Sequence, residues 1–206
     1  MRLVTENVPG NSAKIRLLLD LVELRPARVL DVGCGDLSLW AGVEDRPDVI
    51  GVDVALPPAR VEGIERVRSS ALRLPFGDGE FDAVVSTQML DDLRQRVHAL
   101  REMRRVLRAD GTLLLTCDAR EAPRSWRARA RRVPRGPTVE ALDGEAREAG
   151  LAVENLRRYG LRDLKAIQGR ADSRARMLTL ELEEAIEPHE AGLWTLLYLR
   201  ARAGSD

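Results

Sequence analysis

Two aspartates and a pair of glycines occur where a parallel sheet would bring them together. The stretch 31–35 (DVGCG) ends one apolar run, and Asp53 ends another, 22 residues after Asp31. Glycines let a backbone approach a ligand closely, and a carboxylate at the tip of a neighbouring strand can accept both hydroxyl hydrogens of a ribose. Because such folds bind ligands beyond the carboxyl ends of their strands, this spacing predicts a ribonucleoside site.

The turn favours a cationic nucleoside over a dinucleotide. A dinucleotide fingerprint reads G-x-G-x-x-G, whereas residues 33–38 (GCGDLS) place Ser38 at the third glycine. Asp31, just before the turn, would also repel a pyrophosphate. S-adenosylmethionine carries a sulfonium and an ammonium and no phosphate, so acidic residues beside the turn favour it.

The elements that must position these residues follow from the apolar pattern. Continuous apolar runs at 28–32, 49–53, 81–86 and 112–116 are typical of strands buried on both faces, and they indicate a parallel sheet covered by helices. Helical spacing predicts helices over 13–24 with Ser12 as N-cap, over 93–108 with Asp110-Gly111 as stop and turn, and over 138–149 with Thr138 as cap.

The second half changes character. An exposed connector rich in arginine is expected over 120–137, a strand over 151–159, mostly helix over 161–187 and a last strand over 193–199. Trp194 and Tyr198 share one face of that strand and are expected to pack in the core. We therefore expect one domain over 1–206, divided into an N-terminal helix (1–26), a cofactor-binding core (27–118) and a substrate-side connector, cap and last strands (119–206).

Four stretches occur in a fixed order: VLDVGCGD (29–36), VIGVDVA (49–55), SSALRLPFGDGEFDAVVSTQMLDDL (69–93) and LREMRRVLRADGTLLLT (100–116). Together they resemble the class I S-adenosylmethionine-dependent methyltransferases, in particular the small-molecule, methyltransferase-11-like type, over roughly residues 28–117. The resemblance implies a Rossmann-like, doubly wound α/β sandwich with a mostly parallel, seven-stranded sheet and an antiparallel last strand. It also implies methyl transfer from S-adenosylmethionine, leaving S-adenosylhomocysteine.

The resemblance further implies a set of cofactor-binding residues. These are Asp31, Gly33, Cys34, Gly35, Asp53, Val54, Ser70, Ala71, Leu72, Ser86, Thr87 and Gln88. By the family pattern Asp31, Gly33 and Gly35 line the methionine part, and Asp53 takes the ribose hydroxyls. Ser70 and Ala71 lie beside the adenine. Residues 86–88 would follow the fourth strand, under the sulfonium and facing the substrate.

Two departures from the family pattern concern this site. Leu37 stands where a third glycine is usual, which adds bulk and restricts the backbone, and Ser70 replaces the usual acid. The stretch between Asp53 and Ser70 is short and contains Pro57-Pro58, so the usual helix there is expected to be clipped.

Asp92 is the candidate catalytic residue. It lies just past the fourth strand, where many relatives carry a histidine, and a carboxylate there could deprotonate a hydroxyl or hold an amine near the methyl group. The alternative is an N-cap for the helix beginning at Leu93. His98 is expected on the surface and His189 in a loop, and neither has the neighbours of a metal site.

Composition bounds the partners and the compartment. Lysine plus arginine equals aspartate plus glutamate at 33 each, so no global basic field favours nucleic acid. Cys34 and Cys117 lack the paired spacing of a disulfide framework, and no segment has the length of a membrane span or signal sequence. We expect a soluble, cytoplasmic protein with a small-molecule acceptor.

Two alternatives stay open from the sequence. The seven arginines between 120 and 135 could serve an RNA or protein methyltransferase, although only 3% of residues are aromatic and few could stack on bases. Leu37 and Ser70 instead motivate a non-catalytic scaffold that keeps the fold, with or without the cofactor as a structural or regulatory ligand.

Overall fold

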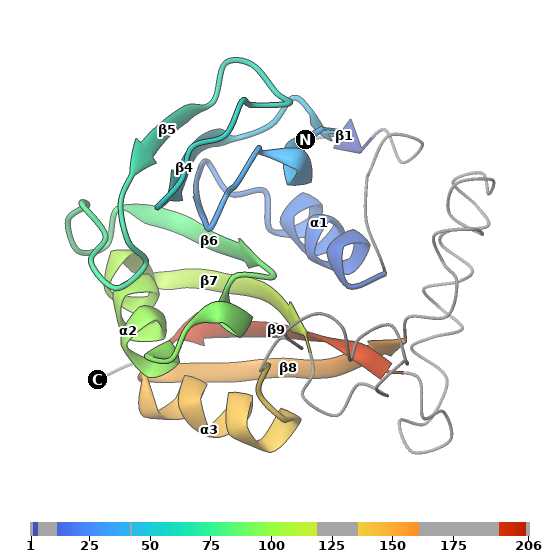
Figure 1. Ribbon diagram of the computed structural model, residues 1–206, viewed down its shortest axis with the longest axis vertical. Helices are drawn as coiled ribbons and strands as arrows, with labels where there is room; N and C mark the ends of the chain where they lie inside the picture. The colour runs from blue at the N-terminus through green and yellow to red at the C-terminus, as the bar shows by residue number, and fades with distance from the viewer. Residues whose placement is uncertain (1, 4–11, 42, 119–135, 161–193, 205–206) are drawn as a thin grey trace.

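The computed structural model describes residues 2–3, 12–41, 43–118, 136–160 and 194–204 (Figure 1). Its helices are α1 (Ser12–Leu24), α2 (Arg96–Val106) and α3 (Val139–Glu148), with short 3-10 helices η2 (Ser38–Trp40) and η3 (Leu90–Asp92). Its strands are β1 (Arg2–Leu3), β2 (Arg28–Val32), β3 (Val43–Glu44), β4 (Asp48–Asp53), β5 (Glu65–Arg68), β6 (Phe81–Thr87), β7 (Leu107–Asp118), β8 (Leu151–Gly160) and β9 (Trp194–Ala203).

Seven of these strands form one sheet in the order β5-β4-β2-β6-β7-β9-β8. The pairs from β5 through β7 are parallel, whereas β9 is antiparallel to both of its neighbours, β7 and β8. This confirms the expected mostly parallel sheet with an antiparallel last strand. A separate antiparallel pair, β1 with β3, was not expected because two-residue strands leave no hydrophobic period to detect.

Helices cover both faces of the sheet. The apolar sides of α2 and α3, including Leu100, Met103 and Leu142, pack with Leu30 and Val84 on one face. On the other face, Leu17, Leu18 and Leu21 of α1 pack with Val29 and Val85 of the central strands. The expected helices over 13–24 and 138–149 are confirmed, but α1 begins at Ser12, which is therefore its first helical residue and not its N-cap. The Thr138 hydroxyl caps α3 as expected, by accepting from the Ala141 amide at 3.1 Å.

The last strand is tied to the first helix through a buried polar contact. The Tyr198 hydroxyl of β9 donates to the Asp20 carboxylate of α1, and Arg16 lies 2.8 Å from the same carboxylate. Both Tyr198 and Asp20 are almost fully buried. The prediction that Tyr198 packs in the core is therefore confirmed, with its hydroxyl group satisfied by a partner as buried tyrosines require.

The helix expected over 93–108 is shorter at both ends. It starts at Arg96 because the 3-10 turn η3 closes on Leu93, which has an extended backbone, so Gln95 and not Asp92 occupies the N-cap position. At the other end, Asp110-Gly111 is no stop and turn but part of β7. The pairing moves from Phe81 with Leu107 to Ala83 with Thr112, so residues 108–111 form a bulge within the strand.

Some expectations fall outside the described residues. These are the arginine-rich connector, apart from 136–137, the helical stretch over 161–187, and His189. His98 is exposed on α2, as expected. Among the described helices, none is long and apolar enough to cross a membrane.

Candidate functional site

The site begins with the register between β2 and β4. Val32 pairs with Val52 in parallel, so the two strands end side by side. Beyond that point the Val52 carbonyl accepts two hydrogen bonds, from the Gly33 amide at 2.7 Å and from the Cys34 amide at 3.1 Å. These bonds hold the first residues of the glycine turn against the end of β4.

Every second residue of the turn has a left-handed backbone conformation. Gly33, Gly35 and Leu37 have φ values of 78°, 50° and 64°, a region that glycine enters without steric cost. A Cβ on Gly33 would lie 2.6 Å from the side chain of Met89, whereas a Cβ on Gly35 would meet nothing within 4 Å. The backbone at Gly35 therefore faces open space, which is what a turn that receives a ligand needs.

Asp53 joins the turn to the end of β4. Its half-buried carboxylate accepts from the Gly35 amide at 2.9 Å through Oδ2 and from the Ala55 amide at 3.0 Å through Oδ1. Each carboxylate oxygen has a second lone pair, so the group can still accept two hydroxyl hydrogens. Next to it, Val54 is 66% exposed and is the one large apolar side chain exposed in the described part of the chain.

Arginine side chains hold the loop that follows β4. Arg60 donates to the Asp36 carboxylate at 2.6 Å, and Arg66 donates to the carbonyls of Gly35 and Pro57 at 3.3 and 2.6 Å. Between β4 and β5 the described chain contains no helix, which confirms the clipped helix expected from Pro57-Pro58. The loop is thus fixed to the glycine turn by side chains where a helix would otherwise pack.

Leu37 and Asp31 both point into the interior. Leu37 is fully buried and packs in the same cluster as Cys34 and Trp40, and Asp31, 1% exposed, accepts from the Trp40 indole N–H at 2.8 Å. Only the 3-10 helix η2 follows the turn, in place of a longer helix. Leu37 therefore adds its bulk to the core and not to the space beside Gly35.

The stretch 69–73 forms a tight turn beside Asp53. The Ser69 amide donates to the Asp53 carbonyl at 3.0 Å, and the Ser70 hydroxyl accepts from the Leu72 amide at 3.2 Å. Ala71 is buried, and Leu72 packs partly against the core. A serine that closes its own turn in this way replaces the acid expected from the family pattern without loss of the turn.

Residues 86–88 differ from the expectation that they follow the fourth strand. Ser86 and Thr87 lie inside β6, because the parallel ladder with β7 continues to the pair Thr87 with Thr116. The Ser86 hydroxyl is buried and donates to the Val32 carbonyl at 2.8 Å, so it ties β6 to β2. Gln88 is the first residue after the strand. It is exposed, and its backbone N–H donates to the Thr116 carbonyl at 2.7 Å.

Asp91 and Asp92 both lie in the 3-10 turn η3 after β6, and the buried carboxylate of the two is that of Asp91. Asp91 is 8% exposed, and its Oδ1 accepts from the Asp118 amide, at the end of β7, at 2.8 Å, whereas Asp92 is exposed. Burial, followed by the charge of Asp118, raises the pKa of Asp91 to about 7. The sequence pattern favoured Asp92, whereas the buried carboxylate of the Asp91-Asp92 pair is that of Asp91, because the turn that orients the two residues is 3-10 and not α-helical.

The two cysteines, Cys34 and Cys117, are buried and have no reactive arrangement in the described part of the chain. The Cys34 thiol is buried, and burial together with the charges of Asp31 and Asp53 raises its pKa to about 12, so it stays protonated as part of the apolar wall. Cys117 is also a free, buried thiol. Within the described residues no group of histidine, cysteine and acidic side chains could hold a metal ion.

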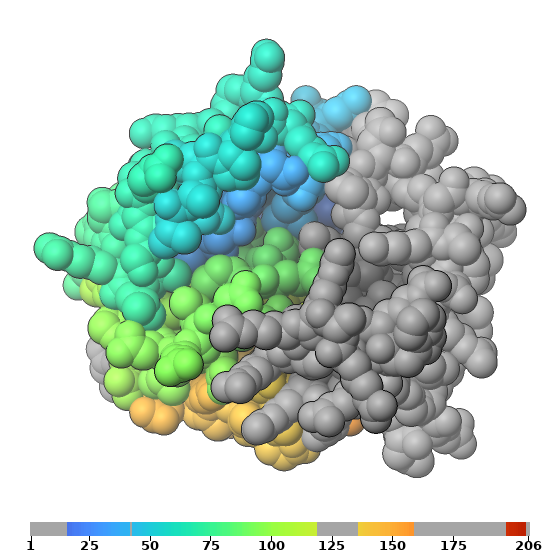
Figure 2. All heavy atoms as spheres, viewed as in Figure 1, coloured from blue at the N-terminus to red at the C-terminus, as the bar shows by residue number. Residues whose placement is uncertain are grey.

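The space-filling view shows where these segments reach the surface (Figure 2). Blue atoms of the region around β2 are set back between teal atoms of the β4–β5 region and green atoms of the region that includes β6. A separate hollow of about 310 Å³ lies near the amino ends of β2 and β6, lined by residues that include Arg25, Pro26 and Asp82. That hollow is at the strand ends opposite the glycine turn, so it is not part of this site.

Known proteins with similar sequences and structures agree with this geometry. Residues 30–115 match the family described as Methyltransferase domain. The demethylmenaquinone methyltransferase of Beutenbergia cavernae is 37% identical over 107 residues, 48% of this chain and 45% of that protein. The malonyl-[acyl-carrier protein] O-methyltransferase of Geobacter sulfurreducens is 36% identical over 138 residues, 60% of this chain and 52% of that protein.

The chain spans about half the length of these curated relatives. Among solved structures, an S-adenosylmethionine dependent methyltransferase from Mesorhizobium loti superposes with a TM-score of 0.66 at 19% identity, covering 95% of this chain and 99% of that one. At that identity the likeness bears on the fold, and it confirms the Rossmann-like architecture.

Replacing Leu37 by glycine is expected to destabilise the protein. Glycine removes roughly 1–2 kcal/mol of left-handed strain, but the loss of a fully buried leucine costs about 2–5 kcal/mol, so the cavity outweighs the relief. Chemical denaturation of Leu37→Gly should give a lower free energy of unfolding than that of the unaltered chain. An equal or higher value would show that leucine here is a defect of the turn and not part of its core.

The pH dependence of stability should report on Asp91. Because the pKa of Asp91 is raised, between about pH 4 and pH 7 the folded protein keeps a proton that the unfolded chain has already released. This contribution to stability is present at low pH and is lost as the pH rises through about 7. Relative to the unaltered chain, Asp91→Asn should therefore gain stability as the pH rises from about 4 to about 7. Asp92→Asn, at an exposed side chain, is the control variant. Parallel stability curves for Asp91→Asn and the unaltered chain would contradict the assignment.

Proposed function

We propose that this protein is a class I S-adenosylmethionine-dependent methyltransferase, which transfers the methyl group of this cofactor to a small-molecule acceptor. The match of residues 30–115 to the methyltransferase domain family supports this proposal. The observation that carries the proposal is the contact between the Gly35 amide and the Asp53 carboxylate at the shared end of β2 and β4. This contact brings an open backbone turn, the Asp53 carboxylate and the exposed Val54 side chain next to one another, which supports the proposal.

The chemistry of these groups fits the cofactor. The carboxylate of Asp53 would accept the ribose hydroxyls, and Val54 would offer an apolar surface to the adenine ring. The turn over 69–72 would close the other side of the base, and the backbone at Gly35 would border the methionine part. S-adenosylmethionine supplies an activated methyl group, so the protein's task is to align the acceptor and exclude water.

We place the acceptor beside Asp91. A carboxyl group with a pKa near neutrality is suited to take a proton from a hydroxyl or from an ammonium group as the acceptor attacks. Its bond to the Asp118 amide fixes it between the ends of β6 and β7, next to the strand end that carries Gln88. The proposed acceptor is thus a nucleophile that must lose a proton, such as an alcohol, a phenol or an amine.

Other features support a small acceptor in a reducing compartment. Acidic and basic residues balance at 33 each and aromatic residues are scarce, which disfavours nucleic acid as the acceptor. Cys34 and Cys117 are free thiols, as in proteins of the cytoplasm.

Calorimetric titration with S-adenosylhomocysteine tests the cofactor assignment. We expect micromolar binding by the unaltered chain, and a dissociation constant at least about tenfold higher for Asp53→Asn, because hydrogen bonds to charged groups contribute about 1.5–3 kcal/mol. Asp48→Asn, at the other end of the same strand, is the matched control and should bind like the unaltered chain. Equal affinities for the two variants would contradict the site.

The role of Asp91 is tested by transfer of a labelled methyl group to a panel of phenols and amines. For any acceptor that is methylated, Asp91→Asn should lower the rate about 10²–10⁴-fold, the contribution typical of a general base. Asp92→Asn should stay close to the unaltered rate because its side chain is exposed. The opposite order of the two variants would return the catalytic role to Asp92.

A further inference from the structure

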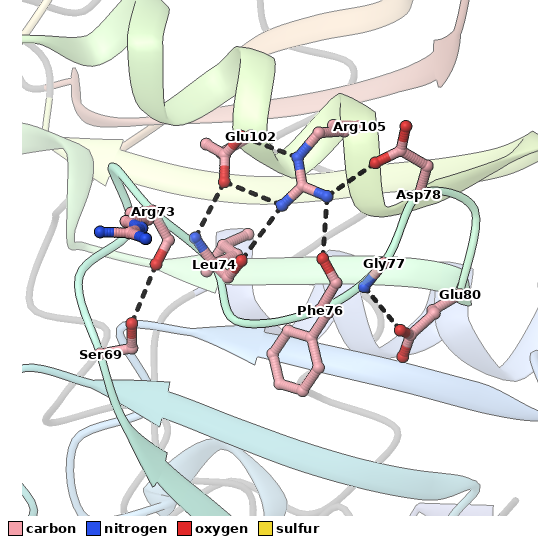
Figure 3. A network of polar contacts seen from close by, with 9 residues as sticks. All are labelled: Ser69, Arg73, Leu74, Phe76, Gly77, Asp78, Glu80, Glu102 and Arg105. Atoms are coloured by element: carbon pink, nitrogen blue, oxygen red, sulfur yellow. Dashed lines mark hydrogen bonds and ion pairs between the residues drawn. The ribbon is translucent and has the colours of Figure 1, made fainter.

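A polar network centred on Arg105 joins α2 to the segment between β5 and β6 (Figure 3). The guanidinium donates to Glu102 Oε1 at 2.8 Å, Glu102 Oε2 at 2.9 Å, the Phe76 carbonyl at 2.8 Å, the Asp78 carboxylate at 2.8 Å and the Leu74 carbonyl at 3.1 Å. Arginine has five N–H donors in a fixed planar fork, and five contacts to acceptors use the whole fork.

Glu102 completes the network from the same helix. Its Oε2 also accepts from the Leu74 amide at 2.9 Å, and the contact with Arg105 lowers the pKa of Glu102, so the carboxylate stays ionised. Leu74, which is 3% exposed, therefore has its N–H bonded to Glu102 and its C=O bonded to Arg105. Two side chains of α2 satisfy this residue's backbone as a neighbouring strand would.

The segment that Arg105 and Glu102 hold begins at Leu74, directly after the 69–73 turn that we propose to lie beside the adenine. The Ser69 hydroxyl donates to the Arg73 carbonyl at 2.9 Å, and the Arg73 amide donates to the Ser70 carbonyl at 3.0 Å, immediately before Leu74. At its other end the turn is held by the bond from the Ser69 amide to the Asp53 carbonyl. The turn is therefore fixed at two points, at Asp53 and at Leu74.

We propose that Arg105 and Glu102 are positioning residues that hold the 69–73 turn in the conformation that receives the adenine ring. This inference rests on the proposed function. Residues 69–80 contain no helix and no strand, apart from an isolated bridge between Ser70 and Arg73. Without the contacts of Arg105 and Glu102, which we call the clamp, the conformational entropy lost on ordering these residues would oppose binding of the cofactor. Because the clamp orders these residues during folding, Arg105 and Glu102 set the affinity and the base selectivity of a site that neither side chain touches.

The position of α2 itself does not depend on Arg105. Leu100, Met103 and Val106 are fully buried on its core face, and Arg96 forms a two-pronged contact with Glu145 of α3 at 2.6 and 2.7 Å. A change at Arg105 should therefore loosen the 69–80 segment while the helix stays packed.

The test compares two ligands that differ only at the base: S-adenosylhomocysteine and S-inosylhomocysteine. Arg105→Lys keeps the charge and the helix propensity but loses the fork. We expect this variant to bind S-adenosylhomocysteine about tenfold more weakly, and its preference for the adenine form over the inosine form to fall toward one. Arg101→Lys, on the same helix but paired with Glu148, should leave both constants unchanged. Glu102→Gln should behave like Arg105→Lys with a smaller loss, and it serves if the lysine variant does not fold.

The outcomes separate this inference from the function on which it rests. Binding by the unaltered chain, with the same base preference in Arg105→Lys and Glu102→Gln as in the unaltered chain, would overturn the positioning role alone. A parallel loss for both ligands would also overturn it, because that is the result of general destabilisation. Absence of binding by the unaltered chain would overturn the proposed function, and the adenine assignment with it.

Discussion

The parallel register of β2 and β4 is the constraint on which the site depends. Because Val32 lies beside Val52, both strands end at one level, and the Val52 carbonyl can hold the first two amides of the glycine turn. A shift by one residue would turn Asp53 to the opposite face of the sheet and remove its bond to Gly35. The register in turn depends on burial of both strands between α1 and the α2–α3 layer, where a shifted apolar pattern would place polar groups in the core.

Around the carboxyl ends of β2 and β4, arginine contacts hold the loops in places where helices would otherwise pack. Only the 3-10 helix η2 follows the glycine turn, and the described chain has no helix between β4 and β5 or between β5 and β6. Arg60 and Arg66 hold the first of these loops to the turn, and Arg105 holds the second to α2. A planar, permanently charged fork suits this role because it bonds several backbone carbonyls at once. The abundance of arginine is thus structural at these positions, and it does not require a nucleic-acid partner.

The sheet and the glycine turn could be predicted from the sequence, but which of the two aspartates after β6 is buried could not. Continuous apolar runs identify strands buried on both faces, and the Asp31 to Asp53 spacing identifies the edge where they end. The choice between Asp91 and Asp92 depends on whether the turn after β6 is 3-10 or α-helical, which neighbouring residue types do not encode. The contacts of Arg105 could not be predicted from the sequence either, because nothing in the residues around one arginine among many indicates which backbone groups it bonds.

The most direct test of the account is to map amide chemical shifts of ¹⁵N-labelled protein during titration with S-adenosylhomocysteine. We expect the largest shifts in three separate stretches, at residues 33–35, 53–55 and 70–72, which only the fold brings together. Shifts confined to the opposite edge of the sheet, around Pro26 and Asp82, would contradict it, because the ligand would then occupy the hollow at the amino ends of the strands.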